Sequence, residues 1–403
     1  MGELWVRRFG SVAAFTLLLA AAIPPAQAVV PAVVLEGSGW GHGVGMAQDG
    51  AYWMGRAGID TAGILGQFYP GTRTARAGGP VRVAVAATRP GDALLAFPGG
   101  GEIRDARTGP LAAGFPLRIP PGGQVLVRYD GGRYSAQPLA GAGSPGPPSE
   151  PGTAPSTPRT LWAIPRPGTT VALPATGHRY RGMIEAVGLP GGPGLRLLNE
   201  VDVEAYLRGM GEVRDPSWPP ASLRAQAIAA RTYALRAMAT SGEICADERC
   251  QVYLGQQAEY PAMDEAVVRT SGLVLTFAGQ LASTVYSANG GGESASREEG
   301  FGPAAAGPPA DYPYLRAAPY PTRDPDPWSV VVALERVAAR LGYPGELSSV
   351  SVVEAGPSGR ALRVALDGSA GTRTVTGIEV ARALGLRSTR FRAHGTVGAG
   401  APA

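Results

Sequence analysis

Two predicted helices meet at a carboxylate, Glu212, that could act as a general acid and base. The first helix follows Asp202, a plausible N-cap, and ends near Gly211. The second carries Pro220 in its first turn and runs to about Met238. A carboxylate at such a junction can face a cleft between the elements that it joins. Glu212 is therefore the leading candidate for proton transfer.

The second predicted helix is almost apolar on every side, which is typical of a buried helix. Gln226 and Tyr233 fall on one side of it, and Arg224 and Arg231 fall on another. Polar groups inside a buried helix need partners, because an unpaired one costs several kcal/mol. Two interpretations stay open. The polar residues either hold neighbouring loops in a core, or they line a cleft whose mouth Glu212 faces.

Glycine occupies every second position from Gly37 to Gly45. In an extended strand this pattern removes all side chains from one face, so that a ligand can approach the backbone closely. The opposite face would carry Trp40 and His42. Alternatively, the glycines only permit close packing of strands, with His42 half buried. A helix is expected next, from about Gln48 to Ala57.

The N-terminus and the overall charge indicate an exported protein that does not bind nucleic acid. Residues 1–28 contain two arginines, an apolar run and the sequence Ala26-Gln27-Ala28, a pattern typical of a secretory signal peptide, although an uncleaved anchor stays open. The net charge of the 403 residues is only +4, too small to indicate nucleic-acid binding. In an exported chain the two cysteines, Cys245 and Cys250, are expected to form a disulfide. We expect no metal and no cofactor.

Local patterns predict a mixed α+β fold with a buried central helix pair, β-hairpins and a small β-rich subdomain, and an active-site cleft between them. Short alternating runs place the β-rich subdomain at residues 79–139. Residues 140–166 are rich in Pro, Gly and Ser and are expected to form a linker. The core is predicted at residues 167–391, completed by the glycine-rich block 29–78, and residues 392–403 are expected to form a flexible tail.

Four sequence blocks resemble the stage II sporulation protein D family, which includes the amidase-enhancer proteins. The blocks are VDVEAYLRGMGEV..SWPPASLRAQAIAARTYAL, CQVYLG, TSGLVLTFAGQ..STVYSANGGGES and GWGHGVGMAQDGA...GILGQFYPGT. The last block usually closes the domain, whereas here it comes first, which resembles a circular permutation. Two serines typical of the family are replaced, by Ala47 and Asn289.

The resemblance implies a lytic transglycosylase that acts on peptidoglycan glycan strands and leaves 1,6-anhydro-MurNAc ends, with Glu212 as the catalytic residue. In such an enzyme the C6 hydroxyl of the sugar attacks the anomeric carbon, so one carboxylate is enough. The residues expected to bind substrate are His42, Gln48, Arg224, Gln226, Arg231, Tyr233, Ser287 and Asn289. The alternative is a non-catalytic wall-binding protein that localises or stimulates an amidase. We expect a monomer in the cell wall or secreted.

Overall fold

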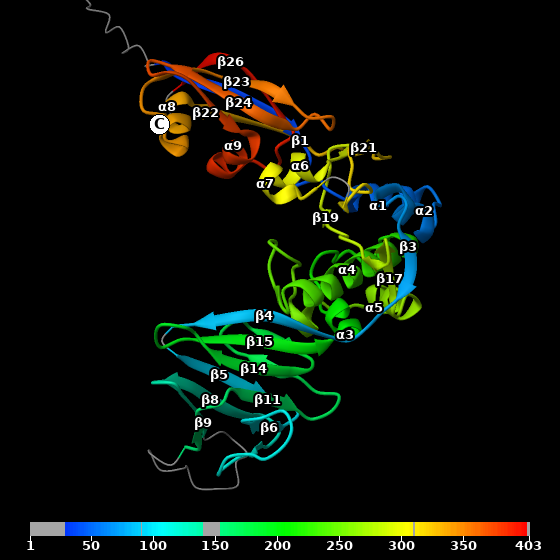
Figure 1. The fold of residues 1–403 in the computed structure, drawn as a ribbon, viewed down its shortest axis with the longest axis vertical. Helices are drawn as coiled ribbons and strands as arrows, with labels where there is room; N and C mark the ends of the chain where they lie inside the picture. The colour runs from blue at the N-terminus through cyan, green and yellow to red at the C-terminus, as the bar shows by residue number, and fades with distance from the viewer. Residues whose placement is uncertain (1–28, 90, 140–153, 309–310, 401–403) are drawn as a thin grey trace, which may run out of the picture.

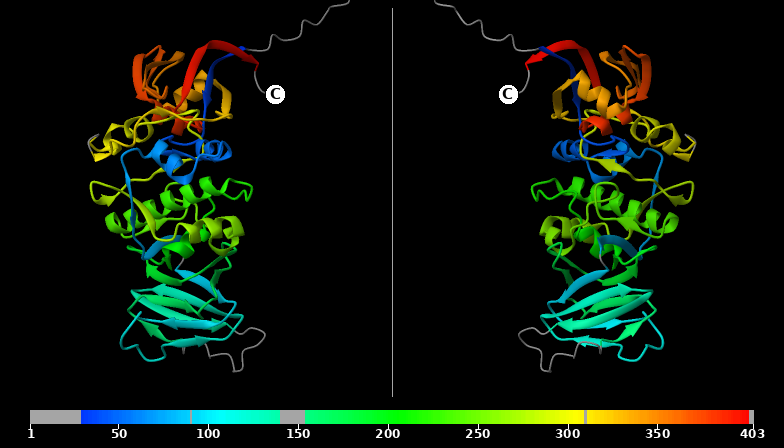
Figure 2. Two further views of the ribbon diagram at one scale, coloured as in Figure 1. Left: turned by 90° about the vertical axis from the view of Figure 1, so that its right-hand side faces the viewer. Right: turned by 90° about the vertical axis from the view of Figure 1, so that its left-hand side faces the viewer.

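The apolar helix α4 (Pro220–Thr240) lies at the middle of the molecule, with a β-sandwich on one side and the N-terminal glycine loop on the other (Figure 1). The computed structural model describes residues 29–89, 91–139, 154–308 and 311–400. Three layers follow one another along the longest axis, and the side views show the same order (Figure 2). The predicted mixed α+β class is confirmed, since helices and several separate sheets are present.

The first layer is a sandwich of a seven-stranded and a six-stranded sheet. The larger sheet has the order β16-β4-β15-β14-β11-β6-β7, and the smaller has the order β10-β9-β8-β5-β12-β13. The strands are β4 (Pro80–Thr88), β5 (Asp92–Phe97), β6 (Gly101–Arg104), β7 (Leu117–Ile119), β8 (Gly123–Asp130), β9 (Arg133–Leu139), β10 (Ser156–Thr157), β11 (Leu161–Pro165), β12 (Val171–Leu173), β13 (His178–Tyr180), β14 (Met183–Gly188), β15 (Leu195–Asp202) and β16 (Ile244–Cys245).

The middle layer gathers the helices around α4. It contains β2 (Met46–Ala47), α1 (Gln48–Arg56), α2 (Thr61–Phe68), β3 (Arg73–Arg76), α3 (Val203–Arg208), the 3-10 helix η1 (Gly255–Ala258), α5 (Pro261–Arg269), β17 (Leu273–Phe277), β18 (Gln280–Leu281), β19 (Tyr286–Ser287), β20 (Glu293–Ser294), α6 (Arg297–Phe301), α7 (Pro303–Ala306) and β21 (Ala318–Pro319). The N-terminal block joins this layer directly, because β2 pairs with β19 and both α1 and α2 pack on α4.

The third layer combines the two ends of the described chain. β1 (Val29–Ser38) lies between β22 (Pro327–Ala333) and β26 (Phe391–Gly400), and it is antiparallel to both. A second sheet and two helices complete the layer: α8 (Leu334–Leu341), β23 (Leu347–Ala355), β24 (Ala361–Gly368), β25 (Gly371–Thr376) and α9 (Gly377–Leu384).

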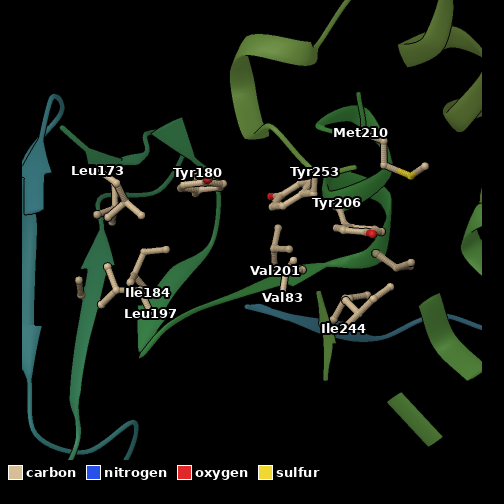
Figure 3. Packing of buried hydrophobic residues seen from close by; sticks show 14 of the residues in the cluster. Val83, Leu173, Tyr180, Ile184, Leu197, Val201, Tyr206, Met210, Ile244 and Tyr253 are labelled. Atoms are coloured by element: carbon tan, nitrogen blue, oxygen red, sulfur yellow. The ribbon is translucent and has the colours of Figure 1, made fainter. Parts of the chain in front are cut away.

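A continuous apolar cluster joins the sandwich to α3 and α4. Tyr180 of β13, Tyr253 of the CQVYLG block and Tyr206 of α3 lie next to one another in it (Figure 3). Their ring centroids are 5.6 Å apart for Tyr180 and Tyr253, and 4.8 Å apart for Tyr253 and Tyr206. The cluster therefore fixes the sandwich, the first helix and the CQVYLG segment relative to one another.

The glycine-rich segment is not the extended strand that its alternating pattern predicted. β1 ends at Ser38, and Gly39, Gly41, Gly43 and Gly45 all have positive φ, between +72° and +99°. A side chain at Gly43 would collide with the guanidinium of Arg360. The glycines are thus required by a tightly wound loop and by close approach of the protein itself.

Several predicted boundaries also differ from the structure. Residues 161–165 of the expected linker form β11 inside the larger sheet, because Leu161, Trp162 and Ala163 are buried between its neighbours. The β-rich unit thus extends past residue 139 to Asp202. Residues 392–400 belong to β26 rather than a tail, since they pair with β1 at the opposite end of the chain.

Some expectations fall on residues that the structure does not describe. These are the predicted signal peptide (1–28), most of the expected linker (140–153) and the last residues of the expected tail (401–403). Among the helices of the described residues, none is both long and apolar enough to cross a membrane.

Arg231 connects α4 to three other elements. Its side chain is fully buried and forms an ion pair of 2.6 Å with Glu204 of α3. It also donates to the carbonyl of Leu273 at 3.1 Å and lies within hydrogen-bonding distance of Thr270. Arg231 was expected to bind substrate, and this expectation is wrong: its donors are used to hold α3, α5 and β17 around α4.

We expect Arg231→Met to lower the free energy of unfolding by about 3 kcal/mol, because Glu204 and the Leu273 carbonyl lose a buried partner. Urea unfolding followed by circular dichroism measures the change. Arg269→Met is the matched control, since Arg269 is 67% exposed and should contribute less than about 0.5 kcal/mol. Equal losses in the two variants would contradict the structural role of Arg231.

Candidate functional site

Glu212 faces a cavity of about 280 Å³ in the middle layer. The walls come from the glycine loop, α1, α4, the disulfide loop, the strand β19 and α6. The lining residues include Trp40, His42, Gln48, Glu212, Tyr233, Glu248, Tyr286, Ser287 and Phe301. Five of the predicted site residues, His42, Gln48, Glu212, Tyr233 and Ser287, are therefore brought together. A larger cavity of about 780 Å³ lies in the β-sandwich, far in sequence from these residues, and Glu212 does not line it.

Backbone pairing with the CQVYLG block holds Glu212 in place. The N–H of Gly211 donates to the carbonyl of Val252 at 2.8 Å, and the N–H of Leu254 donates to the carbonyl of Gly209 at 2.9 Å. The N–H of Val252 then donates to Glu212 Oε1 at 2.7 Å. One carboxylate oxygen is thus anchored by the backbone, which fixes the direction of the other.

Burial raises the pKa of the Glu212 carboxyl. The negative charge of Glu248, which lines the same cavity, adds to this shift, whereas hydrogen bonds from Val252, Gln48 and Tyr286 oppose it. The carboxyl is therefore easier to protonate than an exposed glutamate. A group that must donate a proton and later accept one benefits from such a shift.

Gln48 and Gln226 form a pair behind Glu212. The amide of Gln48, the first residue of α1, donates to Gln226 Oε1 at 3.4 Å. Gln48 lines the cavity, but Gln226 is only 1% exposed and its Nε2 has no protein partner. Gln226 therefore reaches the cavity only through Gln48.

His42 is neutral in this environment. Its Nδ1 accepts a hydrogen bond from the N–H of Val44 at 3.0 Å, which places the proton of the neutral ring on Nε2. Burial and then the positive charge of Arg360 lower the pKa of His42 to about 4. The ring packs against Phe301, with 4.8 Å between the ring centroids. His42 can therefore orient groups in the cavity but is a poor proton donor to substrate at neutral pH.

Besides Gln226, three of the predicted site residues do not line the cavity. Asn289 is buried and stabilises its own loop, residues 289–292. It donates to the carbonyl of Asp324 at 2.8 Å and accepts from the N–H of Gly291 at 2.7 Å. Arg224 lies at the start of α4 outside the cavity lining, and Arg231 is the buried connector described above. The cleft interpretation of α4 holds only for the side that carries Tyr233, and the core interpretation holds for Arg231.

Sequence reasoning missed several residues of the cavity. Tyr286 and Glu248 line it directly, and Trp40, 55% exposed, stands at its edge with the Arg387 guanidinium 4.5 Å from its ring centroid. Gln251 lies behind Tyr286 and donates to its hydroxyl at 2.8 Å. Gln251 and Tyr286 occur in the CQVYLG and STVYSANGG blocks, so their motif membership was the available signal.

The disulfide predicted between Cys245 and Cys250 is present. It closes the short loop that carries Glu248 and Arg249 at the edge of the cavity. Within the described residues, no three His, Cys, Asp or Glu side chains are grouped as metal ligands would be.

A second carboxyl, the half-buried Asp49, lies beside the cavity but does not line it. Burial raises its pKa to about 6, although Tyr320 donates to its Oδ1 at 3.0 Å. The other oxygen has no protein partner. Because Glu212 reaches the cavity and Asp49 does not, Glu212 remains the better candidate for chemistry.

Comparisons with known proteins agree with the resemblance read from the sequence. Residues 192–277 match the family model described as Stage II sporulation protein, and this range contains Glu212, all of α4 and both cysteines. An uncharacterized protein of Brachyspira hyodysenteriae (strain ATCC 49526 / WA1) is 28% identical over 183 residues, which are 42% of this chain and 48% of that protein. The chain thus matches about half the length of this relative.

No solved structure matches the chain. The family match points to a cell-wall-related role.

We expect Asp49→Asn to stabilise the protein at pH 7.5 by about 1–3 kcal/mol, because the folded state disfavours the charged carboxylate. The raised pKa means that this cost appears as the pH rises from about 4 to about 6, so the gain should vanish below pH 4. Denaturant unfolding at the two pH values measures it. Asp130→Asn, on an exposed residue, is the control. A gain that is the same at both pH values would contradict the assignment.

Proposed function

We propose, on the premise that residues 192–277 form a stage II sporulation protein domain, that the chain is a peptidoglycan lytic transglycosylase. It would cleave the MurNAc-GlcNAc bond of glycan strands and leave 1,6-anhydro-MurNAc ends. The observation that carries this proposal is the position of Glu212, a carboxyl with a raised pKa that is anchored by a backbone N–H and faces a cavity.

The reaction needs one group that changes its protonation state. Protonated Glu212 would give its proton to the glycosidic oxygen as the bond breaks. The carboxylate would then accept the proton of the sugar's C6 hydroxyl as that oxygen attacks the anomeric carbon. The proton is returned to Glu212, so the residue is ready for another cycle and no water is consumed. Neutral His42 and the amide of Gln48 would orient the hydroxyl and N-acetyl groups of the sugar.

Glu248 supports a second candidate, because a hydrolase uses a second carboxylate to activate water. Glu248 lines the same cavity but is exposed on the disulfide loop. A third candidate is a non-catalytic protein that binds glycan strands and localises or stimulates an amidase. Peptidoglycan is the proposed partner in all three cases. Export to the cell wall and a monomeric state stay predictions.

We expect Glu212→Gln to reduce formation of anhydro ends by about 10²- to 10⁴-fold while glycan binding is kept, because shape is preserved and the titrating proton is lost. Purified protein would be incubated with glycan strands, with and without stem peptides, and the products identified by mass spectrometry. Glu248→Gln should leave the rate within about twofold.

The outcomes separate the three candidates. Products heavier by one water, lost in Glu248→Gln, would indicate a hydrolase. Absence of any product, with glycan binding intact, would favour the binding protein. Equal activity of wild type and Glu212→Gln would place the catalytic group elsewhere.

Trp40 offers a flat apolar surface next to the cavity, on which a sugar ring could stack. In the Glu212→Gln background, Trp40→Ala should weaken binding to glycan strands about tenfold, as measured by co-sedimentation or calorimetry. Trp53→Ala is the matched control, because Trp53 also lies under an arginine, Arg323, but does not line the cavity. A similar loss in both variants would show that Trp40 has no specific role.

A further inference from the structure

Gln251 lies at the centre of a buried hydrogen-bond chain behind the cavity. Its side chain is completely buried, as is that of Tyr206. The Tyr206 hydroxyl donates to Gln251 Oε1 at 2.9 Å, and Gln251 Nε2 donates to Tyr286 Oη at 2.8 Å. The same Nε2 lies 3.4 Å from the carbonyl oxygen of Ala230 in α4. All the polar atoms of the amide thus have partners.

The Ala230 carbonyl determines which way the amide points. A carbonyl oxygen can only accept a hydrogen bond, so the atom facing it must be the nitrogen of Gln251. That nitrogen has no lone pair to offer, and Tyr286 must therefore accept from it. A phenol has a single proton. Because Tyr286 already accepts from Gln251, its own proton is free to point away, toward the cavity and Glu212.

We propose that Gln251 is a positioning residue, which directs the single hydroxyl proton of Tyr286 toward the carboxyl of Glu212. Tyr286 lines the cavity together with Glu212 and lies within hydrogen-bonding reach of it. Burial, and next the charge of Glu212, raise the pKa of Tyr286 well above its ordinary value, so the hydroxyl keeps its proton. Gln251 acts through Tyr286 and does not itself line the cavity.

A hydrogen bond donated by Tyr286 would stabilise the carboxylate form of Glu212 and limit the rise in its pKa that burial causes. Other charged and titratable groups face the same carboxyl or line its cavity, namely Glu248 and Arg249 from the disulfide loop, His42 from the glycine loop and Tyr233 from α4. Gln251 is distinguished from these groups because it would change the titration of Glu212 only while the Tyr286 hydroxyl is present.

The value of this arrangement for catalysis rests on the proposed function, but its test does not require activity. The titration of the Glu212 carboxyl carbon would be followed by NMR in the full-length protein labelled with ¹³C-glutamate, with the signal assigned by its loss in Glu212→Gln. Tyr286→Phe should move the midpoint to higher pH, because the carboxylate loses a donor. Gln251→Met should move it in the same direction by a smaller amount.

A double variant tests whether Gln251 changes the titration of Glu212 through Tyr286 or independently of it. In the Tyr286→Phe background, Gln251→Met should cause no further shift, because its route to Glu212 is already lost. Tyr253→Phe is the matched control: its buried hydroxyl donates to Asn199 Oδ1 at 2.8 Å, so it should lower stability without moving the midpoint. If Gln251→Met does not fold, Gln251→Asn keeps the amide but withdraws it by one methylene and should shift the midpoint likewise.

Two results would overturn the proposal. One is an unchanged midpoint in Tyr286→Phe, and the other is a shift by Gln251 variants that is as large without the Tyr286 hydroxyl as with it. A wild type that cleaves no glycan would refute the proposed enzyme instead, and the midpoints would still decide whether Gln251 positions the tyrosine proton.

Discussion

The burial of α4 is the constraint on which the rest of the structure depends. Its 21 residues have no continuous polar face, so every side must be covered. One side, with Leu223 and Ala227, packs into the cluster shared with the β-sandwich. Another, with Ile228 and Ala229, packs into the cluster of the N-terminal block. The helix therefore joins two cores, and the cavity lies where neither core closes over it, beside Tyr233. Arg231 is tolerated within this helix because Glu204 of α3, the end of α5 and the Leu273 carbonyl of β17 offer it acceptors.

The two ends of the described chain pair with each other, and the layer that they form approaches the site from the other direction. β1 leads into the glycine loop, and β26 pairs with β1 along its length. Arg360 enters the space left by the absent side chain of Gly43, and its Nη1 donates to the carbonyl of Gly41 at 3.3 Å. Burial lowers the pKa of Arg360 to about 10, which still leaves it charged at neutral pH. The C-terminal layer thus supplies the charge that helps keep His42 neutral.

The cavity combines groups whose protonation preferences differ. Burial works against the charged forms of both Glu212 and His42, so it raises one pKa and lowers the other. At mildly acidic to neutral pH, His42 is neutral and the glutamate is easier to protonate than usual. This arrangement favours a single proton donor and acceptor with uncharged polar groups around it, which suits a sugar better than an ionic substrate. The exposed Glu248 and Arg249 are exceptions, and their loop is restrained by the disulfide.

The sequence alone determined what depends on local pattern. It located α4 and α1 to within two residues, the disulfide, and Glu212 at a helix junction, because helical periodicity, capping and prolines act over a few residues. Its short motifs also indicated the resemblance to the stage II sporulation protein family that residues 192–277 match. Tertiary structure decided what depends on distant partners. Alternating glycines fit a strand or a loop of positive φ, and only contacts with Arg360 and Val285 select the loop. Residues 392–400 carry few apolar side chains, so only their pairing with β1 makes them a strand. The roles of Arg231 and Gln251 were equally hidden, since a buried polar residue is defined by the partners that the fold brings to it.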